Sequence, residues 1–245
     1  VHAAFDGLRD RIDHRPDSLV WNAQGGVLDV LHGPTRSTAR VPHGPLIVAT
    51  GATDRVLPLP GWTLPGVYTL GGAQVALKFQ GCAIGQRVVF MGTGPLLYLV
   101  AYQYAKAGAQ VAAVLDTARL ADKLAATPAM LRQPAVLAKG VYFVAWLRAH
   151  GVPLHGGVRP LRVIGDDAAS RVTGVAWHDG REERRIDCDA VGFGYALRSE
   201  TQLADLLGCR FEFAPMHRAH LPVRDAAGRS SVAGVYPAGG GAGTM

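Results

Sequence analysis

At 245 residues, the chain is long enough for one large domain or two small ones, each with a buried hydrophobic core. Hydrophobic residues make up 49% of it, and the absence of a low-complexity tract or fixed-period repeat excludes a solenoid and a disordered tail. The formal net charge is +6, yet basic residues are scattered among acidic ones and do not interleave with aromatic residues, which argues against nucleic-acid binding.

Three cysteines, Cys82, Cys188 and Cys209, are far apart in the sequence and include no C-x-x-C pair. This spacing excludes a dithiol redox centre, a zinc knuckle and an iron–sulfur cluster. The nine histidines show no metal-ligand spacing, so we expect no metal site. The sparse, odd cysteine count indicates a reducing compartment, and no apolar run reaches the ~20 residues that cross a membrane. We therefore expect a cytoplasmic protein without a signal peptide or membrane anchor.

In chain order, the first predicted elements are short strands. Residues 18–23 and 27–33 flank a glycine-containing turn and predict a β-hairpin. The apolar run 46–50 predicts a buried strand that ends in a tight turn. The prolines and glycine of residues 58–66 exclude a helix or a central strand, so this stretch is predicted to be a linker.

The middle of the chain predicts alternating helices and strands. A helix is expected over residues 69–80, a strand over 87–92, a helix from Pro95 to about Lys106, and a strand over 110–116. Together, these elements form a unit of the β-α-β type, with a glycine-rich turn between its first strand and its second helix.

The second half of the chain predicts one helical region followed by strands. Residues 119–150 have a helical pattern that we expect to break at Pro128 and Pro134. Residues 152–157 are expected to extend the parallel sheet, 158–189 to form an antiparallel meander, and 190–194 to form a further strand. Ser199 and Gln202 have the spacing of a capping box, which predicts a helix over 199–208. Residues 221–240 predict a hairpin and a last strand.

The glycine-rich turn is the strongest candidate binding site. Such a turn lets backbone N–H groups approach a pyrophosphate, to which the start of the following helix adds its positive dipole end. Asp116 ends the next strand, where an acidic side chain accepts hydrogen bonds from a ribose. The candidate nucleotide-binding residues of the turn are Gly92, Thr93, Gly94, Pro95 and Leu96.

The alternative to a nucleotide loop is a tight turn without a ligand, because Leu97 stands where the fingerprint has its third glycine. If the loop does bind a dinucleotide, the charge of Asp116 disfavours a 2′-phosphate and argues for NAD over NADP. Arg119, three residues further on, could offset that preference.

Three segments, residues 49–74, 90–116 and 191–209, together resemble the flavoproteins with two dinucleotide-binding domains, the pyridine nucleotide-disulfide oxidoreductase-like superfamily. Within it, they are most similar to the A (alpha) subunits of opine oxidases, hydrogen cyanide synthases and amino-acid dehydrogenases. The resemblance implies an α/β fold in which a nicotinamide-type, three-layer Rossmann-like domain is inserted in an incomplete FAD-binding domain. We expect the FAD-type parts at residues 1–67 and 198–245, and the NAD(P)-type domain at 68–197.

The resemblance also implies a flavin- and pyridine-nucleotide-dependent oxidoreductase, the A-type subunit of a heteromeric dehydrogenase that oxidises an amine, opine or amino acid. Its implied partners are that small-molecule substrate and a second dehydrogenase subunit. Two alternatives stay open. One is an NAD(P)H-dependent flavoprotein reductase that passes electrons to a partner protein. The other is a degenerate nucleotide-binding or assembly subunit without catalysis, which the absence of a first flavin loop and the glycine at position 240 would support. No catalytic residue is nominated, because no general base is visible in the sequence.

By the same resemblance, two glycine-containing segments would lie against FAD. The family has an acidic residue where Gly240 stands, and no strand–GxGxxG–helix unit precedes Ser18, so the chain looks like a fragment without the first flavin loop. We therefore expect this chain to retain FAD poorly. The candidate FAD-binding residues are Thr50, Gly51 and Ala52 in the first segment and Gly239, Gly240, Gly241 and Ala242 in the second.

The stretch 129–151 contains no acidic residue and is apolar on several helical faces. A helix with this pattern must be covered by other groups. We expect Tyr142, Phe143 and Trp146 to be buried in the core together with Tyr98 and Tyr102. The alternative is that the first three form a surface for a partner subunit.

Overall fold

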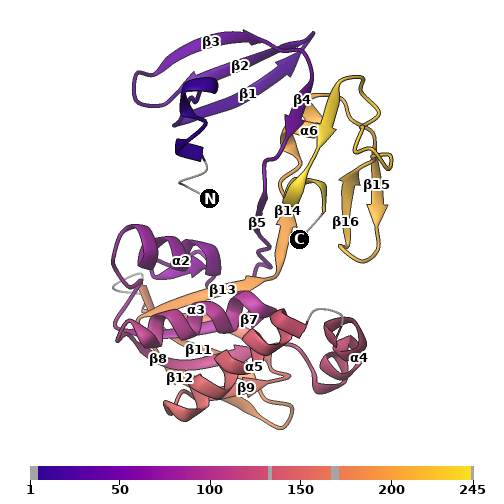
Figure 1. Cartoon of the computed structure of the whole chain (residues 1–245). Coiled ribbons are helices and arrows are strands. Elements are labelled where there is room, and N and C mark those ends of the chain that lie inside the picture. The colour runs from indigo at the N-terminus through magenta and orange to yellow at the C-terminus, as the bar shows by residue number, and fades with distance from the viewer. Residues whose placement is uncertain (1–4, 132–133, 167–170, 244–245) are drawn as a thin grey trace. The chain divides into compact units, whose positions relative to one another are not determined.

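The computed structural model describes residues 5–131, 134–166 and 171–243 of the chain. The chain divides into two compact units (Figure 1). We call Val1–Ala52 with Arg198–Met245 the split unit, and Thr53–Leu197 the inserted unit, because the latter interrupts the former in the sequence. The chain crosses from one unit to the other within β5 (Ala52–Asp54) and returns within β14 (Leu197–Ser199).

The inserted unit is built on a parallel sheet with the strand order β6-β13-β7-β8-β9 (Figure 1). Strands β7 and β8 are almost entirely buried, which is why their sequences are continuous apolar runs. The expected strands over residues 87–92, 110–116, 152–157 and 190–194 are therefore confirmed, within a residue or two at their ends. The strands are β6 (Val67–Thr69), β7 (Arg87–Thr93), β8 (Gln110–Asp116), β9 (Leu154–Gly156) and β13 (Ala190–Tyr195).

Successive side chains of β7 point to opposite faces of the sheet and so divide the core of this unit into two layers. Val88 and Phe90 pack against α2 (Leu70–Phe79), α3 (Pro95–Lys106) and Leu147 of α5 (Pro134–Ala149). Val89 and Met91 point to the opposite face, since successive side chains of a strand alternate. That face is covered by an antiparallel sheet in the order β10-β11-β12, which confirms the expected meander and the three-layer arrangement. Its strands are β10 (Arg159–Asp166), β11 (Arg171–His178) and β12 (Glu183–Asp187).

Helix α4 (Leu120–Leu131) contradicts one prediction, because it continues through Pro128. The sequence pattern placed a break there, since proline lacks an N–H and forfeits one helical hydrogen bond. Every side chain of α4 that the structure describes is exposed to solvent, so the backbone around Pro128 can be hydrated without a buried unpaired carbonyl. The second expected break, at Pro134, adjoins residues 132 and 133, which lie outside the described residues; the described part of α5 begins at Pro134.

The split unit contains a three-stranded antiparallel sheet and a short parallel pair. The expected hairpin is confirmed as β1 (Ser18–Gln24) and β2 (Val27–His32), to which β3 (Ser37–Pro42) adds a third strand. The strand expected at 46–50 is β4 (Leu46–Val48), which pairs in parallel with the last strand, β17 (Val235–Pro237). Its expected burial is wrong for Ile47, which is 70% exposed, whereas Val48 is buried. A 3-10 turn, η1 (Arg9–Arg11), precedes the sheet.

Two further predictions for the split unit are wrong. The expected hairpin within 221–240 instead pairs β15 (Phe211–Ala214) with β16 (Ala219–Pro222), so it lies earlier in the sequence. The expected capping box also fails: Ser199 lies in β14, and α6 is shorter, spanning Gln202–Leu206. The carboxylate of Glu200 accepts the Gln202 N–H at 3.0 Å and so replaces the contact that the capping box would have made.

The core of the inserted unit yields a stability prediction. Tyr104 is fully buried, packs edge-on against Phe90 and donates its hydroxyl to the Ala73 carbonyl at 2.7 Å. Tyr104→Phe keeps the ring and loses one hydrogen bond, so the free energy of unfolding should fall by about 1 kcal/mol. Tyr104→Ala also leaves a cavity and should cost about 3–5 kcal/mol. Urea unfolding measures both, and equal losses would show that the hydroxyl carries the whole effect.

Candidate functional site

The glycine-rich turn lies where the sequence predicted it. Strand β7 ends at Thr93, Gly94 is the N-cap of α3, and Pro95 occupies the first helical turn. In the register of β7 with β8, Gly92 is paired with Asp116, so the two strand ends stand side by side. The Thr117 N–H donates to the Gly92 carbonyl at 2.8 Å and the Thr117 hydroxyl at 3.2 Å. The predicted placement of Asp116 beside the Gly94 loop is confirmed.

The two glycines of the turn are needed for different reasons. At Gly92, with φ +143°, a Cβ would lie 1.8 Å from the Gly194 carbonyl oxygen, so only glycine lets β13 approach β7 this closely. At Gly94, with φ +91°, a Cβ would meet nothing within 4 Å. The Gly94 turn therefore has open space beside its Cα, and the first N–H groups of the following helix, which have no acceptor within the helix, are of the kind that donates to a phosphate.

Leu97 explains how α3 tolerates the missing third glycine. Its side chain is fully buried and belongs to the cluster that joins α3 to β7 and β8. Leucine at this position therefore fills space between the helix and the sheet, whereas a glycine would let them pack closer. The start of α3 stays accessible, because Pro95 is exposed and Gly94 is half-buried.

The Asp116 carboxylate is already bound by three groups of the protein. The residue is only 2% exposed. The Tyr98 hydroxyl, on α3, donates to Oδ2 at 2.6 Å, and Lys123 Nζ, on α4, lies 2.6 Å from the same oxygen. The backbone N–H of Ala118 donates to Oδ1 at 2.9 Å. The acid predicted to bind a ribose is thus held in an ion pair.

Tyr98 and Lys123 are the two site residues that sequence reasoning did not assign to the site. Tyr98 was expected to be a core side chain, but it is only half-buried and its hydroxyl points to a carboxylate. Burial, together with the hydrogen bond to Asp116, raises the pKa of Tyr98 well above its usual range, so it stays a donor. No sequence pattern predicts this contact, because a tyrosine in the first turn of a helix has no general preference for the end of the neighbouring strand.

The two expected flavin segments meet in the split unit. The Ala238 N–H donates to the Val48 carbonyl at 2.9 Å, which continues the pairing of β17 with β4 to the start of both segments. The Thr50 hydroxyl donates to the Glu200 carbonyl at 2.6 Å, and the Glu200 N–H donates to the Gly51 carbonyl at 3.0 Å. The structure therefore brings residues 50–52 together with η2 (Gly239–Ala242).

Gly240 and Gly241 have a packing reason to be glycine. A Cβ on Gly240 would lie 3.1 Å from the carbonyl carbon of Gly51, and one on Gly241 would lie 2.7 Å from the Thr50 hydroxyl oxygen. Close backbone packing, without a ligand, accounts for both. An acidic side chain at position 240 could be accommodated only if residues 51 and 52 shifted. A Cβ on Gly239, which has φ +63°, would meet no atom within 4 Å.

The cysteines and the candidate metal ligands of the described residues relate to two expectations from the sequence. All three cysteines are free, and burial raises the pKa of the Cys188 thiol to about 12, so it is inert at neutral pH. In residues 5–131, 134–166 and 171–243, no cluster of three His, Cys, Asp or Glu side chains could hold a metal ion. None of the helices in the described part of the chain is long and apolar enough to cross a membrane.

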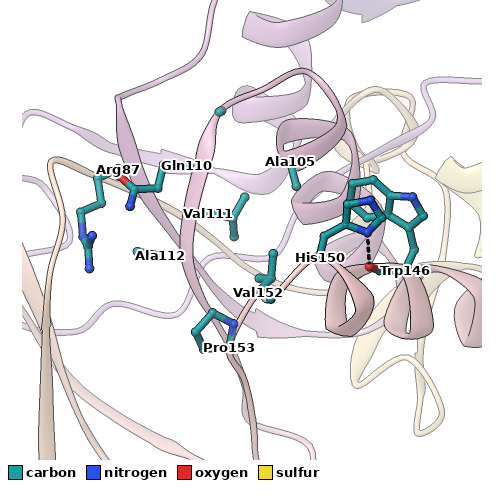
Figure 2. A pocket seen from close by; sticks show the side chains of 11 residues that line it. Arg87, Ala105, Gln110, Val111, Ala112, Trp146, His150, Val152 and Pro153 are labelled. Atoms are coloured by element: carbon teal, nitrogen blue, oxygen red, sulfur yellow. Dashed lines mark hydrogen bonds between the residues drawn. The ribbon is translucent and has the colours of Figure 1, made fainter.

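A pocket of about 490 Å³ lies at the other end of the parallel sheet (Figure 2). Arg87 and Gln110, the first residues of β7 and β8, line it together with Trp146 and His150 of the α5 end. The His150 ring stacks on Trp146 with centroids 3.6 Å apart and donates to its carbonyl at 2.8 Å. Because nucleotides bind at the carboxyl ends of parallel strands, this pocket is separate from the Gly94 loop.

The aromatic side chains of α5 gather around Tyr102 of α3. Its ring centroid lies 5.8 Å from that of Tyr142 and 4.9 Å from those of Phe143 and Trp146. Phe143 and Trp146 are half-buried, but Tyr142 is 51% exposed. The expectation that all these rings are core residues is wrong for Tyr142, because the cluster lies at the edge of the helical layer.

Comparison with known proteins identifies the family to which this chain is similar. A family model described as pyridine nucleotide-disulphide oxidoreductase matches residues 17–245. The opine oxidase A subunit of Agrobacterium tumefaciens (strain Ach5) is 37% identical over 242 residues, 95% of this chain and 47% of that protein. Hydrogen cyanide synthase subunit HcnB of Pseudomonas protegens is 34% identical over 87% of this chain and 47% of its own length. The chain thus spans about half the length of the curated relatives it matches.

Among solved structures, a NAD-dependent persulfide reductase from A. fulgidus superposes with a TM-score of 0.68. The match covers 97% of this chain and 40% of that one at 20% sequence identity, a level at which the likeness concerns the fold. It agrees with the parallel sheet, the covering helices and the antiparallel third layer of the inserted unit.

The two glycines of the turn should respond differently to substitution. Gly92→Ala places a methyl group against the Gly194 carbonyl, so we expect the protein to lose about 3 kcal/mol of stability or more. Gly94→Ala has space but an unfavourable φ, and should cost about 1–2 kcal/mol. Denaturant unfolding compares the two variants. A Gly92→Ala protein as stable as Gly94→Ala would contradict the proposed reason for glycine at position 92.

Proposed function

Because the chain belongs to the pyridine nucleotide-disulphide oxidoreductase family, we propose that it acts as the A-type subunit of a heteromeric dehydrogenase. The proposed substrate is an amine, opine or amino acid. One observation carries this proposal: the similarity to the opine oxidase A subunit extends over 95% of the chain, through both units. The open Gly94 turn beside the carboxyl end of β8 supports a role for a nucleotide in the inserted unit.

The family uses FAD and NAD(P), and the two units divide the residues that would hold them. In the inserted unit, Gly94 and the start of α3 would accept a nucleotide phosphate. In the split unit, residues 50–52 and 239–242 would lie against the flavin. When bound, the flavin supplies the hydride-accepting chemistry of the reaction. The protein would contribute binding, orientation and exclusion of water, and we assign no general acid or base in this chain.

We propose that a second subunit completes the enzyme. Two relatives are named as subunits, HcnB of hydrogen cyanide synthase and the A subunit of opine oxidase. The exposed side chains of α4 and the exposed ring of Tyr142 are suitable for contact with such a subunit, since Leu120, Leu124 and Leu131 are 72%, 64% and 63% exposed. Burial of large apolar side chains is a usual contribution to stable association.

A second candidate is a nucleotide-binding or assembly subunit without chemistry of its own. Two observations favour it: Asp116 is already ion-paired, and position 240 lacks the carboxylate expected from the family. If this second function is correct, the inserted unit would keep its fold and its partner surface, and another subunit would carry out all of the substrate oxidation.

A dye-reduction assay on the complex, and on the accompanying subunits without this chain, distinguishes these candidates, because activity that persists without the chain would favour the assembly subunit. The chain is purified from its own cells through an affinity tag, together with the subunits that accompany it, and FAD is added. Reduction of an artificial acceptor by opines, amines or amino acids is the expected result. Reduction by NAD(P)H alone would favour a flavoprotein reductase that passes electrons to a partner. Loss of the accompanying subunits without loss of dye reduction would contradict the heteromeric dehydrogenase.

Flavin retention gives a further prediction for the 245-residue chain by itself. Among the described residues of the split unit, no strand–glycine loop–helix element cradles a pyrophosphate, and Gly240 offers no carboxylate. We expect desalting to remove FAD, leaving no flavin band in the visible spectrum. Gly240→Asp alone should not restore it, because the new side chain crowds Gly51. A near-stoichiometric flavin band in the desalted chain would contradict this prediction.

A further inference from the structure

The Asp116 ion pair changes what a nucleotide would meet at the carboxyl end of β8. A carboxylate that binds a ribose needs oxygen lone pairs open to the ligand. In this chain, Tyr98 and Lys123 both contact Oδ2, and Ala118 contacts Oδ1. Oδ1 keeps a second lone-pair site, but the carboxylate is almost fully buried, so a ribose hydroxyl can reach it only if a group that covers it moves aside.

Lys123 is the donor that is able to leave. The Ala118 N–H is fixed by the backbone two residues from Asp116, and Tyr98 is half-buried on α3. Lys123 belongs to the exposed helix α4, and its side chain is 43% exposed at the carboxyl end of β8, which we call the mouth of the site. Its ammonium lies 2.6 Å from the carboxylate and 3.5 Å from the Tyr98 hydroxyl oxygen. A ligand that enters beside the Gly94 loop would therefore meet a cation that covers an anion.

The charge at this mouth determines which ribose is favoured. A free aspartate accepts hydrogen bonds from both hydroxyls of an unphosphorylated ribose and repels a 2′-phosphate. When Lys123 neutralises Asp116, the repulsion falls, and the ammonium has donors that can bind a phosphate. The preference for NAD that the acidic residue alone predicts assumes a carboxylate without this partner.

We propose that Lys123 is a specificity-determining residue of the nucleotide site. It weakens binding of NAD(H) by occupying the ribose carboxylate, and it strengthens binding of 2′-phosphorylated NADP(H) by providing a cation for the phosphate. Asp116 then acts mainly as a positioning residue that holds the lysine at the mouth of the site, with Tyr98 as its second donor. This inference rests on the proposed nucleotide contact at the Gly94 loop.

The test measures dissociation constants of NADH and NADPH by calorimetry, at one fixed ionic strength, for the 245-residue chain and its variants. Lys123→Ala removes the cation and opens Asp116, so NADH should bind more tightly and NADPH more weakly. We expect the ratio of the NADPH to the NADH dissociation constant to rise at least tenfold. Lys139→Gln removes an exposed cation of α5 and should leave that ratio unchanged.

Two further variants separate specificity from folding. Lys123→Gln keeps a neutral donor for Asp116, so it protects the buried carboxylate and should still weaken NADPH. Lys123→Arg keeps the cation and should hold the ratio within about threefold of the wild type. A purely structural lysine would instead lower the melting temperature and change both dissociation constants together, which would overturn the inference. Failure of the wild type to bind either nucleotide would overturn the proposed nucleotide contact itself, whereas binding with an unchanged ratio would overturn the role of Lys123 alone.

Discussion

The geometry of the inserted unit depends on how closely β13 can approach β7 at Gly92. The central position of β7 between β13 and β8 brings the carboxyl ends of all three strands to one edge of the sheet. A side chain at Gly92 would force the Gly194 carbonyl away and separate two of those strands. The Gly94 turn and the start of α3 are attached to the end of β7, so their positions depend on this contact, whereas the pairing of β7 with β8 places Asp116 beside them.

A second constraint is electrostatic. A carboxylate as buried as that of Asp116 must be paired or hydrogen-bonded, because isolated charges are costly in a protein interior. In this chain, the Asp116 carboxylate is contacted by Tyr98 of α3, by Lys123 of α4 and by the backbone N–H of Ala118 in the loop after β8. The same arrangement joins two helices to the strand edge, so the stability of this edge and the proposed nucleotide recognition depend on the same atoms.

The sequence predicted most of this frame, because its signals are local. Apolar runs identified β7 and β8, and Pro95 identified the start of α3. Asp116, at the end of β8, indicated that β8 lies beside β7 in the sheet. The failures involve information from elsewhere in the chain. The Glu200 carboxylate replaced the expected capping box, and the pairing of Asp116 with Lys123 depends on where α4 packs, which no residue spacing encodes. Proline inside α4 was misjudged because exposure of the helix, and not its sequence, makes the lost hydrogen bond tolerable.

The exposure of α4 has a consequence for how firmly that helix is held. Since none of its described side chains is buried, little apolar surface ties α4 to the rest of the inserted unit, and the ion pair from Lys123 is its contact with the buried strand edge. Dissolved ions screen a pair whose cation is partly exposed, but such screening does not weaken the apolar burial in the sheet. Rising ionic strength should therefore loosen α4 well before it disturbs the core, which makes salt a selective means of opening the edge of the sheet at Asp116.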